Sequence, residues 1–311
     1  MKYCLYTLLI SALTLAQSTT STYVTDLNGR RAEASSITAS NGERTELSRS
    51  INGREVPLEQ TEERILRQDA NSKVTEKIVR KYDQTGRLTS TERVVTEEQG
   101  FADGGSIVKA STYVSDVNGQ MHESERKTIE SHKRGAVILA DAIIQKPTIN
   151  GTFETAEKRT SVTEPSDGGK HENETVYRRS QNGSFYEALR QTTDAQQKGD
   201  QTVENTAFYE PDVTGQLKLA RQSVSTTSKR SDGTEVTEVN LFSRAVDGRL
   251  QDNESPQQIK EQQIIERRKR ADGAVVEALS VRRPAMSDPK RLGELKQVSE
   301  TVCRGKCSAD H

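Results

Sequence analysis

The stretch "RKYDQTGRLTS" at residues 80–90 places an aromatic residue, an acid, a glycine and a leucine in that order. Asp83 can accept hydrogen bonds from the backbone groups that follow it, and Gly86 can adopt positive φ without strain. Leu88 then restarts an alternating pattern of side chains. The stretch therefore predicts two antiparallel strands that are joined by a tight turn.

Equivalent glycines recur at nearly constant spacing along the chain. Successive members of the series are 33, 33, 32, 32, 32 and 33 positions apart. Such regular spacing indicates that one structural unit is repeated. The glycines predicted to close the turns are Gly53, Gly86, Gly119, Gly151, Gly183, Gly215 and Gly248.

Apolar side chains flank these turns, and the similar glycines Gly29 and Gly293, in two columns, one six positions before the glycine and one two positions after it. Both offsets are even, so we expect each column to stay on one face of its strand. The columns consist of Tyr23, Leu47, Tyr113, Tyr177, Tyr209 and Phe242, and of Leu88, Met121, Phe153, Phe185, Leu217, Leu250 and Leu295.

A second turn signal stands near the middle of each unit, as in "ADGGS" (102–106) and "SDGTE" (231–235). Each unit is therefore predicted to be a hairpin, and short connections can join only antiparallel neighbours. The segments "EQTEERILRQ" (59–68) and "IKEQQIIERRKR" (259–270) would also suit short solvated helices, which leaves that alternative open at these two places.

The composition limits how thick the fold can be. Of the 311 residues only 31% are hydrophobic and 4% aromatic, and there is no tryptophan, whereas ordinary domains are about 45% apolar. Strict alternation after Gly119 puts Met121 and Ile129 on one face with Glu123, Glu125 and Lys127, so neither face is apolar. We predict an all-β fold: an extended antiparallel meander of about eight hairpin repeats, each 32 or 33 residues long, in a thin twisted or curled sheet with little core.

The N-terminal segment has the pattern of a secretory signal. "MKYCLYTLLISALTLAQS" begins with a charged residue, continues with an apolar run and offers small residues for cleavage after Ala16. The predicted domains are a signal peptide (1–16), one β-repeat domain (17–302) and a C-terminal tail (303–311). The expected location is therefore outside the cytoplasm, as a secreted protein.

Cys303 and Cys307 lie close together in the predicted tail. An oxidising compartment favours a disulfide between them, which would close a small loop. A zinc site would need two further good ligands, and the neighbouring His311 alone does not supply them.

The segment "YDQTGRL" (82–88) resembles the YD repeat of the Rhs/YD-repeat family of secreted bacterial proteins, whose units also pair an aromatic residue and Asp with a turn glycine and Arg-Leu. "DGRL" (247–250) is a looser match. In that family the repeats build a long β-sheet that winds into a shell around a cargo. The resemblance implies a β-repeat of secreted bacterial type, although the period of this chain is longer than the family's.

No pattern in the sequence points to catalysis or to a bound cofactor. "DLNG" (26–29) and "DVNG" (116–119) are fragments of a calcium loop, but they lack the third acid and the glutamate that such a loop requires. The histidines are scattered, and neither a phosphate loop nor a nucleophile elbow is present. We therefore expect no enzyme, no catalytic residues, no cofactor and no metal. The histidines are His122, His132, His171 and His311.

These features favour a secreted, non-enzymatic repeat protein that offers a surface for binding, adhesion or assembly. Its expected partners are a cell-surface or extracellular polymer, or further copies joined through the sheet edges, and not nucleic acid. Two alternatives stay open. An outer-membrane β-barrel fits the strand count but requires an apolar, lipid-facing band. A secreted enzyme is the other.

Overall fold

The computed structural model describes residues 18–25, 30–40, 44–51, 54–243, 259–285 and 288–305, and every regular element within these ranges is a β-strand. No helix long and apolar enough to cross a membrane occurs in this part of the chain. The first ten strands are β1 (Ser18–Thr25), β2 (Arg31–Ser40), β3 (Arg44–Ile51), β4 (Arg54–Gln68), β5 (Ser72–Tyr82), β6 (Leu88–Gly100), β7 (Ser106–Ser115), β8 (Met121–Arg134), β9 (Val137–Pro147) and β10 (Phe153–Ser166).

The remaining strands continue the same hairpin pattern. The two segments that could have formed helices, 59–68 and 259–270, instead lie almost entirely in strands β4 and β16. The strands are β11 (Gly169–Arg179), β12 (Phe185–Lys198), β13 (Gln201–Pro211), β14 (Leu217–Lys229), β15 (Glu235–Ser243), β16 (Ile259–Lys269), β17 (Val275–Arg282), β18 (Pro284–Ala285), β19 (Asp288–Leu292) and β20 (Lys296–Arg304).

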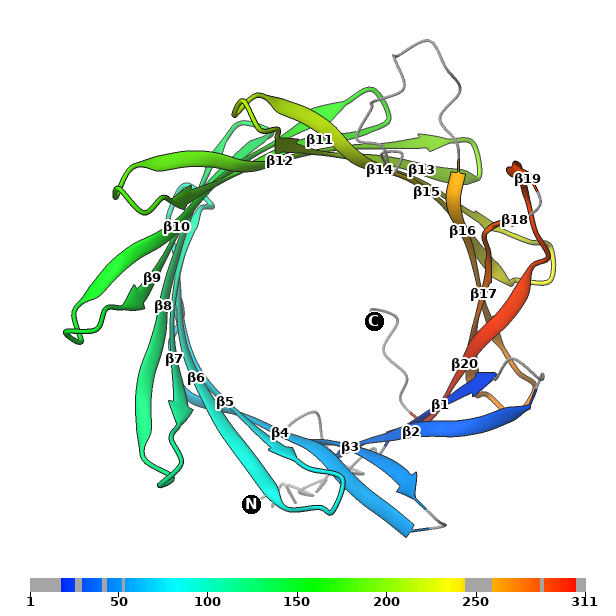
Figure 1. Cartoon of the computed structure of the whole chain (residues 1–311), viewed down its shortest axis with the longest axis horizontal. Helices are drawn as coiled ribbons and strands as arrows, with labels where there is room; N and C mark the ends of the chain where they lie inside the picture. Colours follow the sequence, from blue (N-terminus) through cyan, green and yellow to red (C-terminus); the bar gives the residue numbers. More distant parts are fainter. Residues whose placement is uncertain are drawn as a thin grey trace, which may run out of the picture.

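Eighteen strands form one antiparallel sheet that closes on itself, as the ring in Figure 1 shows. Each strand from β1 to β16 pairs with the next along the chain, β17 pairs with β20, and β20 pairs with β1. Only β18 and β19 stand apart, as a two-stranded sheet. The prediction of an extended meander in a thin twisted or curled sheet is therefore wrong, because the sheet closes into a barrel. Closure leaves the main sheet no free edge, so the predicted self-association through sheet edges cannot involve this sheet.

Glycines in the left-handed region form the tight turns at both ends of the barrel. We call the end that carries the turns with Gly86, Gly119, Gly151, Gly183 and Gly215 rim A, and their φ values lie between 78° and 87°. The opposite end, rim B, carries the turns with Gly104, Gly135, Gly168, Gly199, Gly233 and Gly273, all of which also have positive φ. The predicted turn glycines Gly53 and Gly248 lie outside the described residues.

Aspartates organise the rim A turns. The Oδ1 atom of Asp83 accepts hydrogen bonds from the backbone nitrogens of Thr85 at 2.8 Å and Arg87 at 3.0 Å, and the amide of Gly86 donates to the Asp83 carbonyl at 3.0 Å. Asp116 and Asp212 accept the equivalent pairs of backbone bonds. A short carboxylate that satisfies two amides makes each turn self-contained.

A β-bulge lies near rim A in every described pair whose two strands are connected at that rim. In β7–β8, Thr112 pairs with Glu125 and Tyr113 with Glu123, so that Ser124 is left without a partner. The extra residue reverses the alternation of side chains in β8. Met121 and Glu123 therefore lie on the opposite face from Lys127, and the strict alternation assumed from the sequence is wrong here. The other pairs with a bulge near rim A are β1–β2, β3–β4, β5–β6, β9–β10, β11–β12, β13–β14, β15–β16 and β17–β20. The pair β4–β5 has a bulge at its other end, between Ile65 and Arg67.

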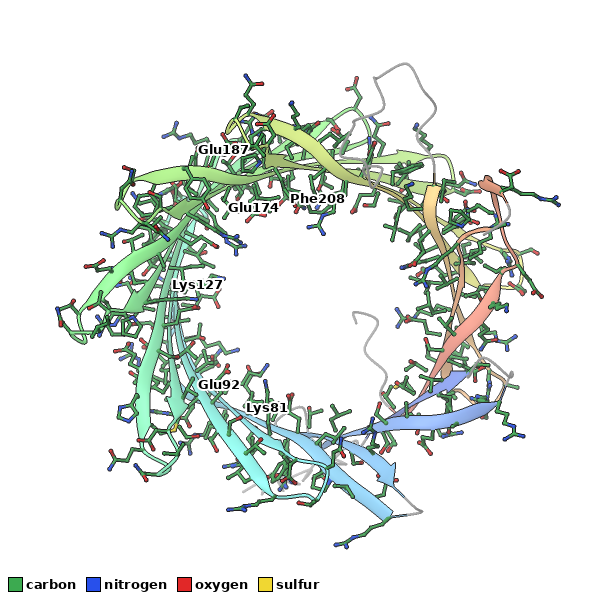
Figure 2. All side chains as sticks on the ribbon, in the orientation of Figure 1. Lys81, Glu92, Lys127, Glu174, Glu187 and Phe208 are labelled. Carbon is green, nitrogen blue, oxygen red and sulfur yellow. The ribbon has the colours of Figure 1, made fainter. Side chains whose placement is uncertain are left out.

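The register assigns each side chain to the inner or the outer face of the wall. Figure 2 places Lys81, Glu92, Lys127, Glu174 and Phe208 on the inner side of the ring. Directly paired residues of neighbouring strands project from the same face, so the register extends this assignment around the barrel. Followed around the whole ring, the assignment arrives back at β5 without contradiction. There Lys81 pairs with the inward-facing Glu59 of β4, and Val79, on the same face of β5, pairs with the inward-facing Glu92 of β6.

Very little of the wall is buried. The largest fully buried side chains among the described residues are Val276 and Val302, each 1% exposed, which pack with Ala274 and Tyr23 beside the closing strands. Val276 and Val302 are direct partners in β17–β20. This small cluster therefore stabilises the part of the barrel where strands distant in sequence meet.

Candidate functional site

The inner face of the barrel is rich in charged side chains of both signs. In Figure 2 the side chains of the described residues line the ring and leave its centre open in this view. Eighteen strands are enough for a barrel to enclose a water-filled channel. We call the space inside the ring the lumen. Charged residues assigned to its wall by the register include Glu59, Lys77, Lys81, Glu92, Lys127, Glu157, Arg159, Glu174, Arg178, Glu204, Arg221, Glu261, Arg267 and Glu277.

Part of this charge is neutralised within the wall. Glu157 of β10 accepts from Arg159 Nε at 2.6 Å and from Arg178 Nε at 3.3 Å. Arg159 also reaches Glu174 of β11 at 3.4 Å. These four residues form one ion-pair network across two strands, so their side chains are held by one another.

A different arrangement occurs on β13 and β14. The guanidinium carbon of Arg221 lies 4.3 Å from the centroid of the Phe208 ring, and the two residues are direct cross-strand partners. Phe208 lies on the inner side in Figure 2, so the register places Arg221 on the lumen wall with it. This is an aromatic and a cationic group presented together to the lumen.

The outer face carries a belt of large apolar side chains next to rim A. The bulges bring both columns of the sequence pattern to this face. In β7–β8, for example, Tyr113 and Met121 lie on the face opposite to the inward-facing Lys127. We call this row the outer belt. Its members are Tyr23, Tyr82, Leu88, Tyr113, Met121, Phe153, Tyr177, Phe185, Tyr209, Leu217 and Phe242. Leu47, by contrast, lies on the inner face, and Leu250 lies outside the described residues.

A second, aliphatic row lies on the outer face nearer rim B. Its members come from strands on several sides of the barrel. Each is the immediate neighbour in the chain of an inward-facing residue, so its own side chain points outward. They are Ile107, Val137, Val203, Val236 and Val276. The outer face therefore has apolar side chains close to both rims.

Charged groups on the outer face recur in an acid–arginine–aromatic arrangement. Arg126 donates to both carboxylate oxygens of Glu123, at 2.9 and 2.7 Å, and its guanidinium lies 4.0 Å from the centroid of Phe153. Neutralising the arginine and covering it with a ring lowers the cost of removing it from water. Within the described strands the sets are Glu300–Arg31–Tyr23, Glu76–Arg93–Tyr113 and Glu123–Arg126–Phe153.

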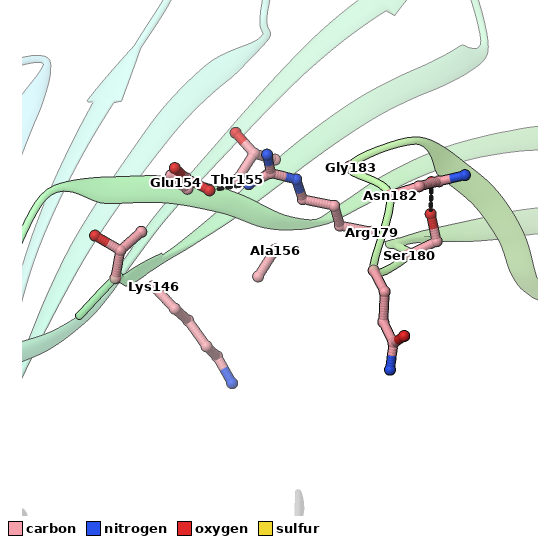
Figure 3. A pocket seen from close by; sticks show the side chains of 10 residues that line it. Lys146, Glu154, Thr155, Ala156, Arg179, Ser180, Asn182 and Gly183 are labelled. Carbon is pink, nitrogen blue, oxygen red and sulfur yellow. Dashed lines mark hydrogen bonds and ion pairs between the residues drawn. The ribbon is translucent and has the colours of Figure 1, made fainter. Parts of the chain in front are cut away.

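A groove of about 550 Å³ lies at rim A between the ends of β9 and β10 and the turn at 180–183. Figure 3 shows the ion pair between Glu154 and Arg179 and the hydrogen bond between Ser180 and Asn182. Lys146, a further charged lining residue, pairs with Glu125 at 3.9 Å. The charges of the groove are thus matched by protein groups.

Each described histidine contacts one or two carboxylates. His122 lies 3.2 Å from Asp116, and His171 lies 2.6 Å from Asp194. His132 contacts Glu130 at 3.0 Å and Asp103 at 3.6 Å. The described residues contain no cluster of three or more His, Cys, Asp or Glu side chains that could hold a metal ion. His311 and the "DLNG" segment lie outside them.

Cys303 lies in β20 and is disulfide-bonded. Its predicted partner Cys307 lies outside the described residues, so the pairing itself stays a prediction. The predicted signal peptide (1–16) also falls outside them.

The sequence did not predict the lumen, because closure of the sheet depends on pairing between distant strands and not on the local pattern of any one strand. It also missed Phe208 and Arg221 as a pair. The available signal was that Phe208 and Arg221 lie at nearly equal sequence distances from Gly215. A hairpin with a bulge at Ala220 brings two such residues opposite one another.

No protein-family model and no curated protein matches this chain. Among solved structures, a mutant of the Rh. blastica porin has a TM-score of 0.50 at 7% sequence identity, over 94% of this chain and 98% of the porin. Salmonella typhi OmpF, in a complex with daunomycin, has a TM-score of 0.49 at 10% identity, over 94% and 96%. At such low identity the likeness to the Rh. blastica porin concerns the fold alone. Together with the closed ring of strands, it identifies the architecture of this chain as a porin-like antiparallel β-barrel.

Proposed function

We propose that the protein forms a water-filled pore in a bacterial outer membrane and lets small polar solutes pass passively, without catalysis. The observation that carries this proposal is the closed eighteen-stranded barrel with charged side chains on its lumen wall. A freely secreted repeat protein with an open binding surface, which the sequence favoured, does not fit a closed barrel with the fold of a porin. The alternative of an outer-membrane barrel replaces it.

The outer belt supports a membrane location. Transmembrane barrels carry aromatic side chains where the wall crosses the membrane–water interface. Tyrosine suits this position because its ring is apolar while its hydroxyl remains hydrated. The hydroxyl of Tyr82, for example, donates to Gln60 at 2.8 Å on the same outer face. The half-buried members of the aliphatic row near rim B, such as Val203 and Val236, would meet the opposite interface, whereas Val276 is covered by its neighbours.

Between the two rows the outer face also holds charged groups, which an apolar band would exclude. Glu76 is the clearest case: its side chain is 3% exposed and it accepts from Arg64 at 2.5 Å and from Arg93 at 2.6 Å. Pairing of this kind reduces the desolvation cost without removing it. The proposal therefore predicts a weaker attachment to lipid than in a barrel with a continuous apolar band.

Refolding of the mature chain in detergent, followed by reconstitution into planar bilayers, tests the proposal. We expect stepwise increases in KCl current, and we expect the protein to enter the detergent-rich phase on phase separation. A variant that carries Tyr113→Asp, Phe153→Asp and Phe185→Asp in the outer belt should partition less into detergent. A matched variant with Lys77→Gln, Lys81→Gln and Lys127→Gln on the lumen wall should partition as the parent does.

Two results would contradict the proposal. One is a folded protein that remains in the aqueous phase and produces no current at any concentration. The other is equal partitioning of the outer-belt and lumen variants, because lipid contact would then not involve the outer face.

A further inference from the structure

Arg221 and Phe208 form a stacked pair on the lumen wall. They are partners in the β13–β14 register, and the guanidinium lies over the ring at 4.3 Å. Stacking on an aromatic face is attractive and favours some rotamers of an arginine over others. The stack therefore favours one orientation of the cation in the lumen.

The guanidinium has no acidic partner within the described part of the chain. Among the described residues, the guanidinium of Arg221 contacts the Phe208 ring, and the Arg221 side chain is exposed. The acids that face inward from β13, Glu204 and Glu210, pair in register with Ser225 and Lys218. By contrast, the lumen arginine Arg178 lies 3.3 Å from Glu157. Arg221 thus keeps its N–H donors available to solutes.

The surroundings of the pair add neutral hydrogen-bonding groups. Gln191 of β12 is the register partner of Phe208 on its other side. One row toward rim B, Thr206 of β13 pairs with Ser223 of β14. An amide and two hydroxyls near an unpaired guanidinium complement an anion and impose no negative charge on it.

We infer that Arg221 and Phe208 form a binding subsite for carboxylate solutes that carry a planar group, of which aromatic monocarboxylates are the simplest. This inference rests on the proposed pore and names a solute class for it. The planar fork of a guanidinium donates two parallel hydrogen bonds to a carboxylate, and its flat face stacks on planar groups. The Phe208 ring supplies an adjoining apolar surface. A lysine ammonium, such as those of Lys77 and Lys127, offers the charge without this geometry.

Block of the KCl current by sodium benzoate tests the subsite, with acetate as the probe that lacks a planar group. The parent protein should be half-blocked at a lower concentration of benzoate than of acetate. Arg221→Gln should raise the half-blocking concentration of benzoate about tenfold, the loss expected for one charge-assisted hydrogen-bonded contact. Arg221→Lys, which keeps the charge, should recover only part of the loss.

Arg178→Gln is the matched control, because it also removes one lumen arginine, but one that is already paired with Glu157. We expect it to change the half-blocking concentration less than about twofold. Phe208→Leu should weaken benzoate block while it leaves acetate block unchanged. Equal effects of Arg221→Gln and Arg178→Gln would show a general response to lumen charge and would overturn the inference.

Binding of benzoate to the detergent-folded protein, measured by saturation-transfer NMR, separates this inference from the proposed pore. If no KCl current is seen but benzoate binding depends on Arg221, the pore proposal fails and the subsite stands. If current is seen but benzoate neither blocks nor binds in a manner that depends on Arg221, the subsite fails and the pore stands.

Discussion

Thr22 of β1 and Thr301 of β20 are direct cross-strand partners whose hydroxyl oxygens lie 3.3 Å apart, although 279 positions separate them in the chain. They belong to a ladder that joins residues 19–24 to residues 299–304. Without this ladder, β1 and β20 would each expose a row of unpaired backbone groups. The pairing turns a chain of hairpins into a barrel.

Removal of one complete hairpin should leave a smaller closed barrel. Deletion of residues 119–150 removes β8 and β9 and joins Asn118 to Gly151, so that the turn sequence before β10 is restored. The direction of every later strand is unchanged, so β1 and β20 can still pair antiparallel. We expect a folded barrel of smaller diameter and, in bilayers, a lower KCl conductance.

Deletion of half of that unit is the control. Loss of residues 119–134 removes β8 alone and reverses the direction of every later strand, so that β20 would meet β1 in parallel. This variant should fold poorly by circular dichroism. If both deletions lose structure equally, closure does not depend on strand direction.

Val302→Ala should destabilise the barrel at its closing strands. Val302 is 1% exposed and packs with Val276, Ala274 and Tyr23. Removal of two buried methyl groups should lower the free energy of unfolding by about 2 kcal/mol. Urea unfolding, monitored by circular dichroism, measures this loss. Val213→Ala is the matched control, since Val213 is fully exposed in a rim A turn. A similar loss in both variants would mean that the small cluster at the closing strands contributes nothing specific.

Gly119→Val should cost about 1–3 kcal/mol through backbone strain alone. Gly119 has a φ of 79°, and apart from its two chain neighbours no described residue comes within 4 Å of the position that a Cβ atom would occupy. Space is therefore available, and only the left-handed conformation opposes the substitution. Gly119→Asn should cost much less, because asparagine adopts this conformation more readily. Equal unfolding free energies for the two variants would contradict the argument.

The rim A turns should weaken in acid. The Thr85 hydroxyl and the following backbone amides lower the pKa of Asp83, the Gln120 amide and His122 lower the pKa of Asp116, and Lys218 with Thr214 lowers the pKa of Asp212. A carboxylate whose folded pKa is depressed stabilises the fold above its unfolded pKa, here 3.8. That contribution disappears as the pH falls below 3.8 through the folded values.

Melting temperatures measured from pH 6 down to pH 2 test this expectation. The triple variant Asp83→Asn, Asp116→Asn and Asp212→Asn retains a side-chain oxygen for each turn but cannot titrate there. Its melting temperature should therefore fall less steeply below pH 4 than that of the parent. Parallel curves would mean that other carboxylates control the acid response.

The sequence by itself determined the hairpins and the turns. Asp83 and Gly86 act within a few residues of one another, and the strand pattern on either side is equally local, so a short segment contains the information. The apolar columns also stayed on one face where they lie in described strands, apart from Leu47 in the first column, which lies inside. The reason is that aromatic residues such as Tyr177 and Tyr209 occupy equivalent positions in successive units.

Only the tertiary structure decided which face is which and whether the sheet is open. The bulge at Ser124 moves Met121 to the outer face, and no local residue pattern predicted this bulge. Closure depends on the accumulated twist and stagger of eighteen strands, and it is completed by contacts such as Thr22–Thr301. The lumen, the outer belt and the Phe208–Arg221 pair are properties of that closed ring. They arise because a sheet with unpaired edges gains a full ladder of hydrogen bonds when its two ends meet.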